Sequence, residues 1–219
     1  MTGPRRESRA ERTARRAEVS DPTVVLDAAF RFLEARGRSI SETRRRLTEA
    51  GYRPALIEQA IERLETIGLL DDEVFARHWV EARDRASPRG EAALRRELSL
   101  RGVAAETIVG VLAARRSEAK SVRPSGSSLR HRLTGESATE PDVRGSGSTE
   151  PDDFDPDHPA SADEAAAARL LERRRRDLER IADPRARRAR AYALLARHGF
   201  APDIAARLAA RSAQESDED

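Results

Sequence analysis

LTEAGY at residues 47–52 is the first of three copies of one short phrase, and LSLRGV at 98–103 and LARHGF at 195–200 are the others. Each copy has a leucine four positions before a glycine and an apolar residue directly after it. The first two glycines lie 51 residues apart, and without one intervening polar stretch the third follows at about 50. A repeat of this length predicts a tandem array of helical units that stack to bury their apolar faces.

The composition favours helices over strands as the building blocks of that array. Of the 219 residues, 37% are charged and only 4% are aromatic, so the core must consist mainly of Leu, Ile, Val and Ala. Such residues suit small helical bundles better than β-sandwiches, whose strands favour β-branched and aromatic side chains. We therefore predict an all-α, elongated tandem array of three three-helix-bundle repeats.

Several classes of protein are excluded by what the sequence lacks. It has no cysteine, which excludes disulfides and thiolate chemistry. No apolar run approaches the roughly 20 residues that span a bilayer, so no membrane association is expected. The arginine-rich segment 1–18 lacks the apolar core of a secretory signal. We expect a cytoplasmic monomer.

Helix-start and helix-stop residues divide the chain into units. Asp21-Pro22 predicts an N-cap followed by proline at the first helical position, and Ser39 with Glu42 fits a capping box. Gly51 ends that second helix, and Pro54 opens a third. We expect a disordered basic N-terminal arm (1–20), helical repeat 1 (21–68), helical repeat 2 (69–116), a disordered acidic, Ser-, Gly- and Pro-rich linker (117–163), helical repeat 3 (164–212) and an acidic tail (213–219).

The second and third repeats show the same kinds of signal. Asp71 and Asp72 predict the N-terminus of the first helix of repeat 2, and Ser87-Pro88 predicts a cap for its second helix. Its last helix is expected over about 105–115. In repeat 3 we expect one helix over about 164–181, a second from Asp183-Pro184, and a third after Pro202.

The residues do not form a recognisable catalytic site. The sequence has no phosphate-binding glycine loop and no nucleophile elbow, and its four histidines lack the spacing of metal ligands. Asp71 and Asp72 are better explained as helix caps than as an acid–base pair. We therefore expect a protein that is not an enzyme and that needs no cofactor or metal.

Arginine is the chemistry that this sequence does offer, since Lys120 is its only lysine. A guanidinium binds phosphate or carboxylate through a planar fork. Arg89 and Arg96 would share one side of a helix starting at Pro88. Trp79 and Tyr192 have the spacing of core residues, which argues against a site where nucleobases stack on aromatic rings. The alternative interpretation of these arginines is a solvated face whose charge is balanced by acidic neighbours. Seven form the candidate surface for a partner protein or DNA: Arg77, Arg83, Arg85, Arg89, Arg95, Arg96 and Arg101.

One extended motif carries a family resemblance. The pattern GLLDDxxFAxxWVxxR at 68–83 continues as PRGxxxLxxELxxRGV at 88–103. It resembles the signature of the RecX family of bacterial recombination regulators. The resemblance covers about 22–116 well and extends over 164–212 as a degenerate third repeat.

That resemblance implies both a fold and a function. It implies three tandem three-helix repeats that bind the RecA recombinase filament on single-stranded DNA, lying in its groove, with weak or indirect contact to the DNA. It further implies inhibition of RecA ATP hydrolysis and strand exchange, and thereby restraint of recombination, DNA repair and the SOS response.

A second reading is a stand-alone DNA-binding protein of helix-turn-helix type that acts without RecA. The turns at Gly51 and Gly102 resemble helix-turn-helix corners. Against this reading, the segment 106–112 has almost no side chains suited to reading bases.

Overall fold

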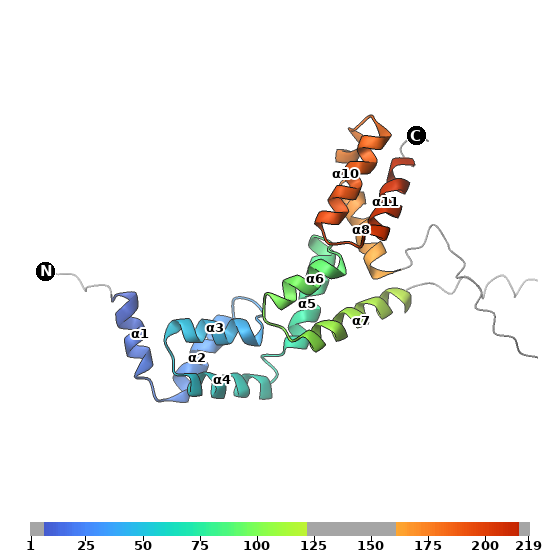
Figure 1. Cartoon of the computed structure of the whole chain (residues 1–219). Helices are drawn as coiled ribbons and strands as arrows, with labels where there is room; N and C mark the ends of the chain where they lie inside the picture. The colour runs from blue at the N-terminus through green and yellow to red at the C-terminus, as the bar shows by residue number, and fades with distance from the viewer. Residues whose placement is uncertain (1–6, 122–160, 215–219) are drawn as a thin grey trace, which may run out of the picture.

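The computed structural model describes residues 7–121 and 161–214, and all regular secondary structure within these ranges is α-helical. Figure 1 shows an elongated, bent array, with the first repeat near one end and the last helices at the other. The prediction of an all-α tandem array of three-helix units is confirmed.

Each repeat has its own buried core of aliphatic side chains, as the composition predicted. Leu64, Leu94 and Leu195, one from each repeat, are completely buried. Helix α1 (Arg9–Ala17) precedes the array. Repeat 1 contains α2 (Pro22–Leu33), α3 (Ile40–Ala50) and α4 (Pro54–Thr66); repeat 2 contains α5 (Asp72–Ala86), α6 (Glu91–Ser99) and α7 (Ala105–Ser121); repeat 3 contains α8 (Ala162–Arg173), α9 (Arg175–Glu179), α10 (Pro184–Arg197) and α11 (Pro202–Gln214).

The repeated leucine–glycine phrase forms the same helix end in all three repeats. In the middle copy Gly102 has φ +76°, and the Val103 N–H donates to the Leu98 carbonyl at 3.2 Å. The equivalent bond is 3.3 Å long in the first and third copies, and their glycines also have positive φ. This is a Schellman C-cap, in which glycine adopts the left-handed conformation without the steric cost of a Cβ.

The same glycine turns are also the points where neighbouring repeats touch. A Cβ added to Gly102 of repeat 2 would lie 2.2 Å from Ser41 Oγ, at the start of α3. A Cβ added to Gly199 of repeat 3 would lie 2.5 Å from the Cβ of Ala93, at the start of α6. Repeats 2 and 3 therefore each place their glycine turn against the start of the middle helix of the preceding repeat.

Helix α1 shows that the expectation of a disordered arm over 1–20 is wrong for residues 9–17. A capping box joins Ser8 and Glu11 at its start. The carbonyl of its last residue accepts a hydrogen bond from Arg53 Nε (2.7 Å), and Thr13 packs against the turn at Gly51. The helix thus occupies the position on repeat 1 that a preceding repeat would take.

Three further boundaries differ from the expected ones. Helix α7 continues to Ser121 because residues 111–121 contain neither Gly nor Pro, and α8 begins at Ala162, so both ends of the expected linker are helical. The rest of the linker, 122–160, lies outside the described residues, as do 215–219 of the acidic tail. The single helix expected over 164–181 is divided at Arg174 into α8 and α9.

The two aspartates at the start of repeat 2 have different roles. Asp71 Oδ1 accepts from the N–H groups of Glu73 (2.7 Å) and Val74 (3.1 Å), which confirms it as the N-cap of α5. Asp72 Oδ1 instead accepts from the N–H of Ile40 at 2.9 Å, at the start of α3. Burial raises the pKa of Asp72. Asp72 therefore links repeat 2 to repeat 1.

Removing the Asp71 cap should destabilise the protein modestly. Asp71→Ala leaves two N–H groups at the start of α5 without their acceptor, and such losses cost about 1 kcal/mol. The free energy of unfolding in urea, followed by circular dichroism, measures the effect. Glu62→Ala, which removes an exposed carboxylate from α4, is the control. Equal stabilities of the two variants would contradict the capping role.

Candidate partner-binding surface

The centre of the candidate surface is a contact between Trp79 on α5 and Glu97 on α6. The Trp79 indole Nε1 donates to Glu97 Oε2 at 2.9 Å, and the indole lies 6.2 Å from the Phe75 ring of the repeat 2 core. Trp79 is only partly buried, so its ring connects the core to the surface. Tyr192, the other aromatic expected at core-like spacing, is 40% exposed, and that expectation is wrong.

Three predicted arginines converge on this pair. Arg83 Nε donates to Glu97 Oε2 at 2.8 Å, and Arg89 Nε lies 3.8 Å from Glu97 Oε1. The guanidinium carbons of Arg83 and Arg101 lie 4.6 and 3.6 Å from the centre of the Trp79 ring. Burial lowers the pKa of Arg101. One carboxylate thus faces three guanidinium groups, which leaves the cluster positively charged.

The positive charge continues into repeat 1. Arg36 pairs with the buried Glu42 at 3.6 Å, and the charges of both residues act on Arg101 across the junction. The guanidinium carbons of Arg38 and Arg46 lie 4.4 and 5.9 Å from the centre of the Phe32 ring. We call this surface the junction patch; it consists of Arg36, Arg38 and Arg46 from repeat 1 and Arg83, Arg89 and Arg101 from repeat 2.

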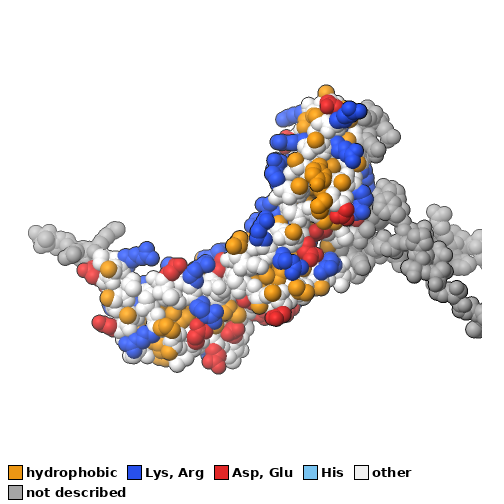
Figure 2. Space-filling model, in the orientation of Figure 1, with side chains coloured by type: hydrophobic (Ala, Val, Ile, Leu, Met, Phe, Trp, Pro, Cys, Tyr) orange, Lys and Arg blue, Asp and Glu red, His pale blue; other side chains and the backbone are white. Residues whose placement is uncertain are grey.

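The arginines of the junction patch are partly embedded in the protein. The Nε atoms of Arg38, Arg89 and Arg101 are buried and have no hydrogen-bond partner in the described part of the chain. Figure 2 shows basic side chains recurring along the inner edge of the bend. Arginines held over aromatic rings lose little further entropy on binding, so the patch suits a carboxylate- or phosphate-bearing partner.

The other four predicted arginines do not belong to the junction patch. Arg77 and Arg95 form exposed pairs one helical turn along with Glu73 (2.7 Å) and Glu91 (3.0 Å), which contribute little. Arg85 and Arg96 are exposed.

The expected alignment of Arg89 with Arg96 is wrong. Helix α6 begins at Glu91, with Gly90 rather than Ser87 at its N-cap. Arg89 therefore precedes the helix, and the seven-residue spacing does not place it on the same helical face as Arg96.

The sequence did not single out the repeat 1 half of the patch. No motif marks Arg38 and Arg46. Glu97 stands out only as a member of the signature, and the spacing of Trp79 indicates a core residue. A signal was available in the pattern of an aromatic residue followed by arginines on the next helix. Its meaning depends on the packing of α2 against α3, which the tertiary structure provides.

His198 lies at the contact between repeats 2 and 3. Its Nδ1 is 3.1 Å from the Pro88 carbonyl oxygen. Burial lowers the pKa of His198, and the charges of Arg89, Arg174 and Arg197 lower it further, against the hydrogen bond to Pro88. The folded protein therefore favours the neutral imidazole.

Acidification should lower the free energy of unfolding through the protonation of His198. A histidine pKa below its ordinary value of 6.5 means that the unfolded state takes up the proton more readily. Its contribution to stability is therefore complete above about pH 6.5 and declines as the pH falls from there to the folded pKa. The difference between urea midpoints at pH 7.5 and 5.5 should shrink in His198→Asn. It should remain in the control His78→Asn, which alters an exposed histidine; equal differences in both variants would contradict the assignment.

Residues 7–121 and 161–214 contain no group of three or more carboxylate or imidazole side chains suited to a metal ion. None of the helices in these ranges combines the length and the apolar character needed to cross a bilayer.

Comparison with known sequences identifies the family. Profiles of the first, second and third three-helix domains of RecX match residues 26–64, 71–112 and 162–208. The chain belongs to the RecX family. These matches fall on the three repeats, and the first two of them include all six residues of the junction patch.

Curated RecX proteins are similar to parts of this chain. Regulatory protein RecX of Prosthecochloris aestuarii is 40% identical over 84 residues, which are 38% of this chain and 56% of that protein. Regulatory protein RecX of Mycolicibacterium vanbaalenii is 36% identical over 115 residues, 52% of this chain and 62% of the relative. The chain thus spans little more than half the length of these relatives.

Solved RecX structures share the fold. The crystal structure of RecX from Lactobacillus salivarius matches 90% of this chain and 97% of its own, with a TM-score of 0.58 at 15% identity. A crystal structure of a regulatory protein RecX matches 89% of this chain and 72% of its own, with a TM-score of 0.55, also at 15% identity.

Proposed function

We propose that this protein binds the RecA recombinase and its filament on single-stranded DNA, and that it inhibits RecA ATP hydrolysis and strand exchange. Restraint of recombination, DNA repair and the SOS response would follow. The observation that carries the proposal is the junction patch, because it lies within the first two RecX domains and spans two repeats of an elongated array. A long, bent array is suited to a helical groove that exceeds the size of a single bundle.

The chemistry of the patch favours an acidic protein surface over bases as its main contact. Two guanidinium groups lie over the Trp79 ring, so the ring is not free to stack on a nucleobase. Preorganised arginines complement carboxylates, and long-range attraction between opposite charges accelerates encounter. Contact with single-stranded DNA would then be weak or reached through RecA.

The test is a RecA ATPase assay on single-stranded DNA with increasing amounts of this protein. Substoichiometric protein should lower the rate. Arg36→Glu combined with Arg46→Glu should raise the concentration for half-maximal inhibition by about tenfold or more, since about 1.4 kcal/mol of lost contact suffices for that change. An unchanged ATPase rate at all concentrations would overturn the proposal.

A matched control distinguishes the effect of the junction patch on inhibition from a general effect of the protein's charge. Arg45→Glu combined with Arg63→Glu makes the same change of charge on exposed arginines of repeat 1 that lie outside the junction patch. Inhibition by this control should stay close to that of the unchanged protein. Tight, sequence-specific binding to duplex DNA without RecA would instead support the helix-turn-helix alternative.

A further inference from the structure

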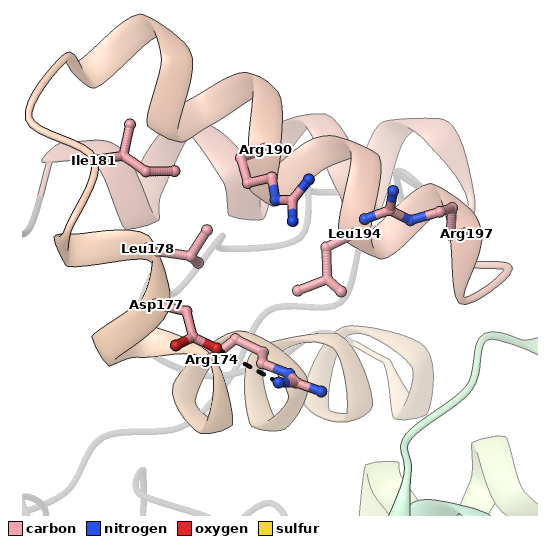
Figure 3. A pocket seen from close by; sticks show the side chains of 7 residues that line it. All are labelled: Arg174, Asp177, Leu178, Ile181, Arg190, Leu194 and Arg197. Carbon is pink, nitrogen blue, oxygen red and sulfur yellow. Dashed lines mark hydrogen bonds and ion pairs between the residues drawn. The ribbon is translucent and has the colours of Figure 1, made fainter.

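A second surface lies in repeat 3, well away from the junction patch along the array. A pocket of about 660 Å³ lies between α9 and α10 (Figure 3). Its apolar part consists of Leu178, Ile181 and Leu194, of which Leu178 is buried and the other two are partly buried. An apolar surface of this kind is stabilised when another apolar side chain covers it.

The rim of the pocket carries an excess of positive charge. Arg174, Arg190 and Arg197 surround it, with Asp177 as the one acidic residue in its lining. Asp177 is already engaged by Arg174 at 3.4 Å. Arg190 and Arg197, both exposed, form no hydrogen bond or ion pair with any residue of the described ranges.

Helix α10 aligns these features on one face. Arg190, Leu194 and Arg197 are spaced by four and three residues, so they follow one another along one side of the helix. Figure 3 shows the two guanidinium groups on either side of Leu194 along α10. The arrangement places two uncommitted positive charges beside an apolar contact.

We infer that this pocket binds an acidic protein segment that carries an apolar side chain. The side chain would pack on Leu178, Ile181 and Leu194, and flanking carboxylates would pair with Arg190 and Arg197. This site is separate from the junction patch and goes beyond the proposed function, because it needs no contribution from repeats 1 and 2.

A peptide fits the pocket better than a nucleic acid strand. The apolar lining is aliphatic, whereas strands without base pairing are held by aromatic side chains on which bases stack. A sugar–phosphate backbone would satisfy the arginines but would leave the partly buried Ile181 and Leu194 without apolar cover. An acidic segment with a Leu or Phe side chain satisfies both parts.

The test uses the full chain and a fluorescein-labelled peptide, in which a central Leu-Phe pair is flanked by two aspartates on each side. Fluorescence anisotropy should show saturable binding with a dissociation constant on the order of 10 μM. Arg190→Glu combined with Arg197→Glu should weaken binding at least about tenfold. Arg188→Glu, an exposed arginine of α10 outside the pocket, should change it less than about twofold.

Peptide controls and competitors decide the nature of the ligand. Replacing the Leu-Phe pair by two serines, or the aspartates by asparagines, should each abolish measurable binding. Equal binding of these peptides, no saturable binding at all, or equal binding to the double variant would overturn the inference. Competition by an oligothymidylate that depends on Arg190 and Arg197 would overturn it in favour of a phosphate site. The sequence DDFDPD at 152–157 is itself an acidic segment with one aromatic side chain. Tighter peptide binding by Phe154→Ser would overturn the inference in favour of this segment of the same chain.

Discussion

Gly90→Ala is expected to uncouple repeat 3 from repeat 2. A Cβ at this position would lie 2.1 Å from the Gly199 carbonyl oxygen and 2.5 Å from the Phe200 nitrogen, and neither backbone atom can rotate away. The Gly90 N–H also donates to the His198 carbonyl at 3.0 Å, a bond that the required shift would break. The cost should reach or exceed the upper end of the about 1–3 kcal/mol typical of overpacking.

The change should appear as a loss of cooperativity as well as of stability. Urea unfolding of Gly90→Ala should separate into two transitions, and small-angle X-ray scattering should show a larger radius of gyration. Gly110→Ala is the matched control, because a Cβ there meets nothing within 4 Å. In the interior of α7 it should stabilise the protein by about 0.5–1 kcal/mol. If Gly90→Ala behaves like this control, the close contact between the repeats is not formed in solution.

Arg115→Met should cause the second large loss. Arg115 is 9% exposed, and its guanidinium donates twice to Asp84 (2.8 and 2.9 Å) and once to Asp163 (2.6 Å). Burial acts to lower the pKa of Arg115, but the hydrogen bonds and charges of these two aspartates outweigh it and raise the pKa. The single side chain therefore ties α5 and α7 of repeat 2 to the start of α8 in repeat 3.

Without Arg115, two poorly solvated carboxylates would face one another. Removing one partner of such a buried pair costs about 3–5 kcal/mol, because the remaining charges lose their compensation. Arg116→Met is the control, since Arg116 is about half exposed and pairs only loosely with Glu91 at 3.4 Å. Its loss should cost about 0–1 kcal/mol. Similar urea midpoints for the two variants would show that the Arg115 cluster does not stabilise the interface.

The contacts around Gly90 and Arg115 bear on the proposed function. Asp163 accepts from Arg115 through one oxygen and from the Glu91 N–H (2.9 Å) through the other, so α8 and α6 share one anchor. The shape of the bend, and hence the direction in which repeat 3 extends from the junction patch, depends on these contacts. A variant that opens this interface should inhibit RecA less even though the junction patch is unchanged.

Local signals determined most of the helices and many of their ends. Asp21, Ser39 and Asp71 cap helices where the sequence predicted caps, and each leucine–glycine phrase ends a helix as expected. These signals act within one helical turn, so they can be predicted from the sequence without knowledge of the fold. Composition and repeat length were likewise sufficient for the all-α array. The capping box of α1 is equally local, but it lies within a run of arginines whose composition also suits a disordered arm.

Contacts between distant residues were decided only by the tertiary structure. The sequence identified seven arginines but could not divide them into Arg83, Arg89 and Arg101, which converge on Glu97, and four that lie elsewhere. That division depends on how α5 packs against α6 and how repeat 2 docks on repeat 1. Likewise, the sequence predicts that each of these glycines ends a helix, but it does not predict that a neighbouring element packs against the glycine turn. The physical reason is the range of the forces: capping is settled by neighbours in sequence, whereas docking depends on the shapes of surfaces that the sequence separates by about 50 residues.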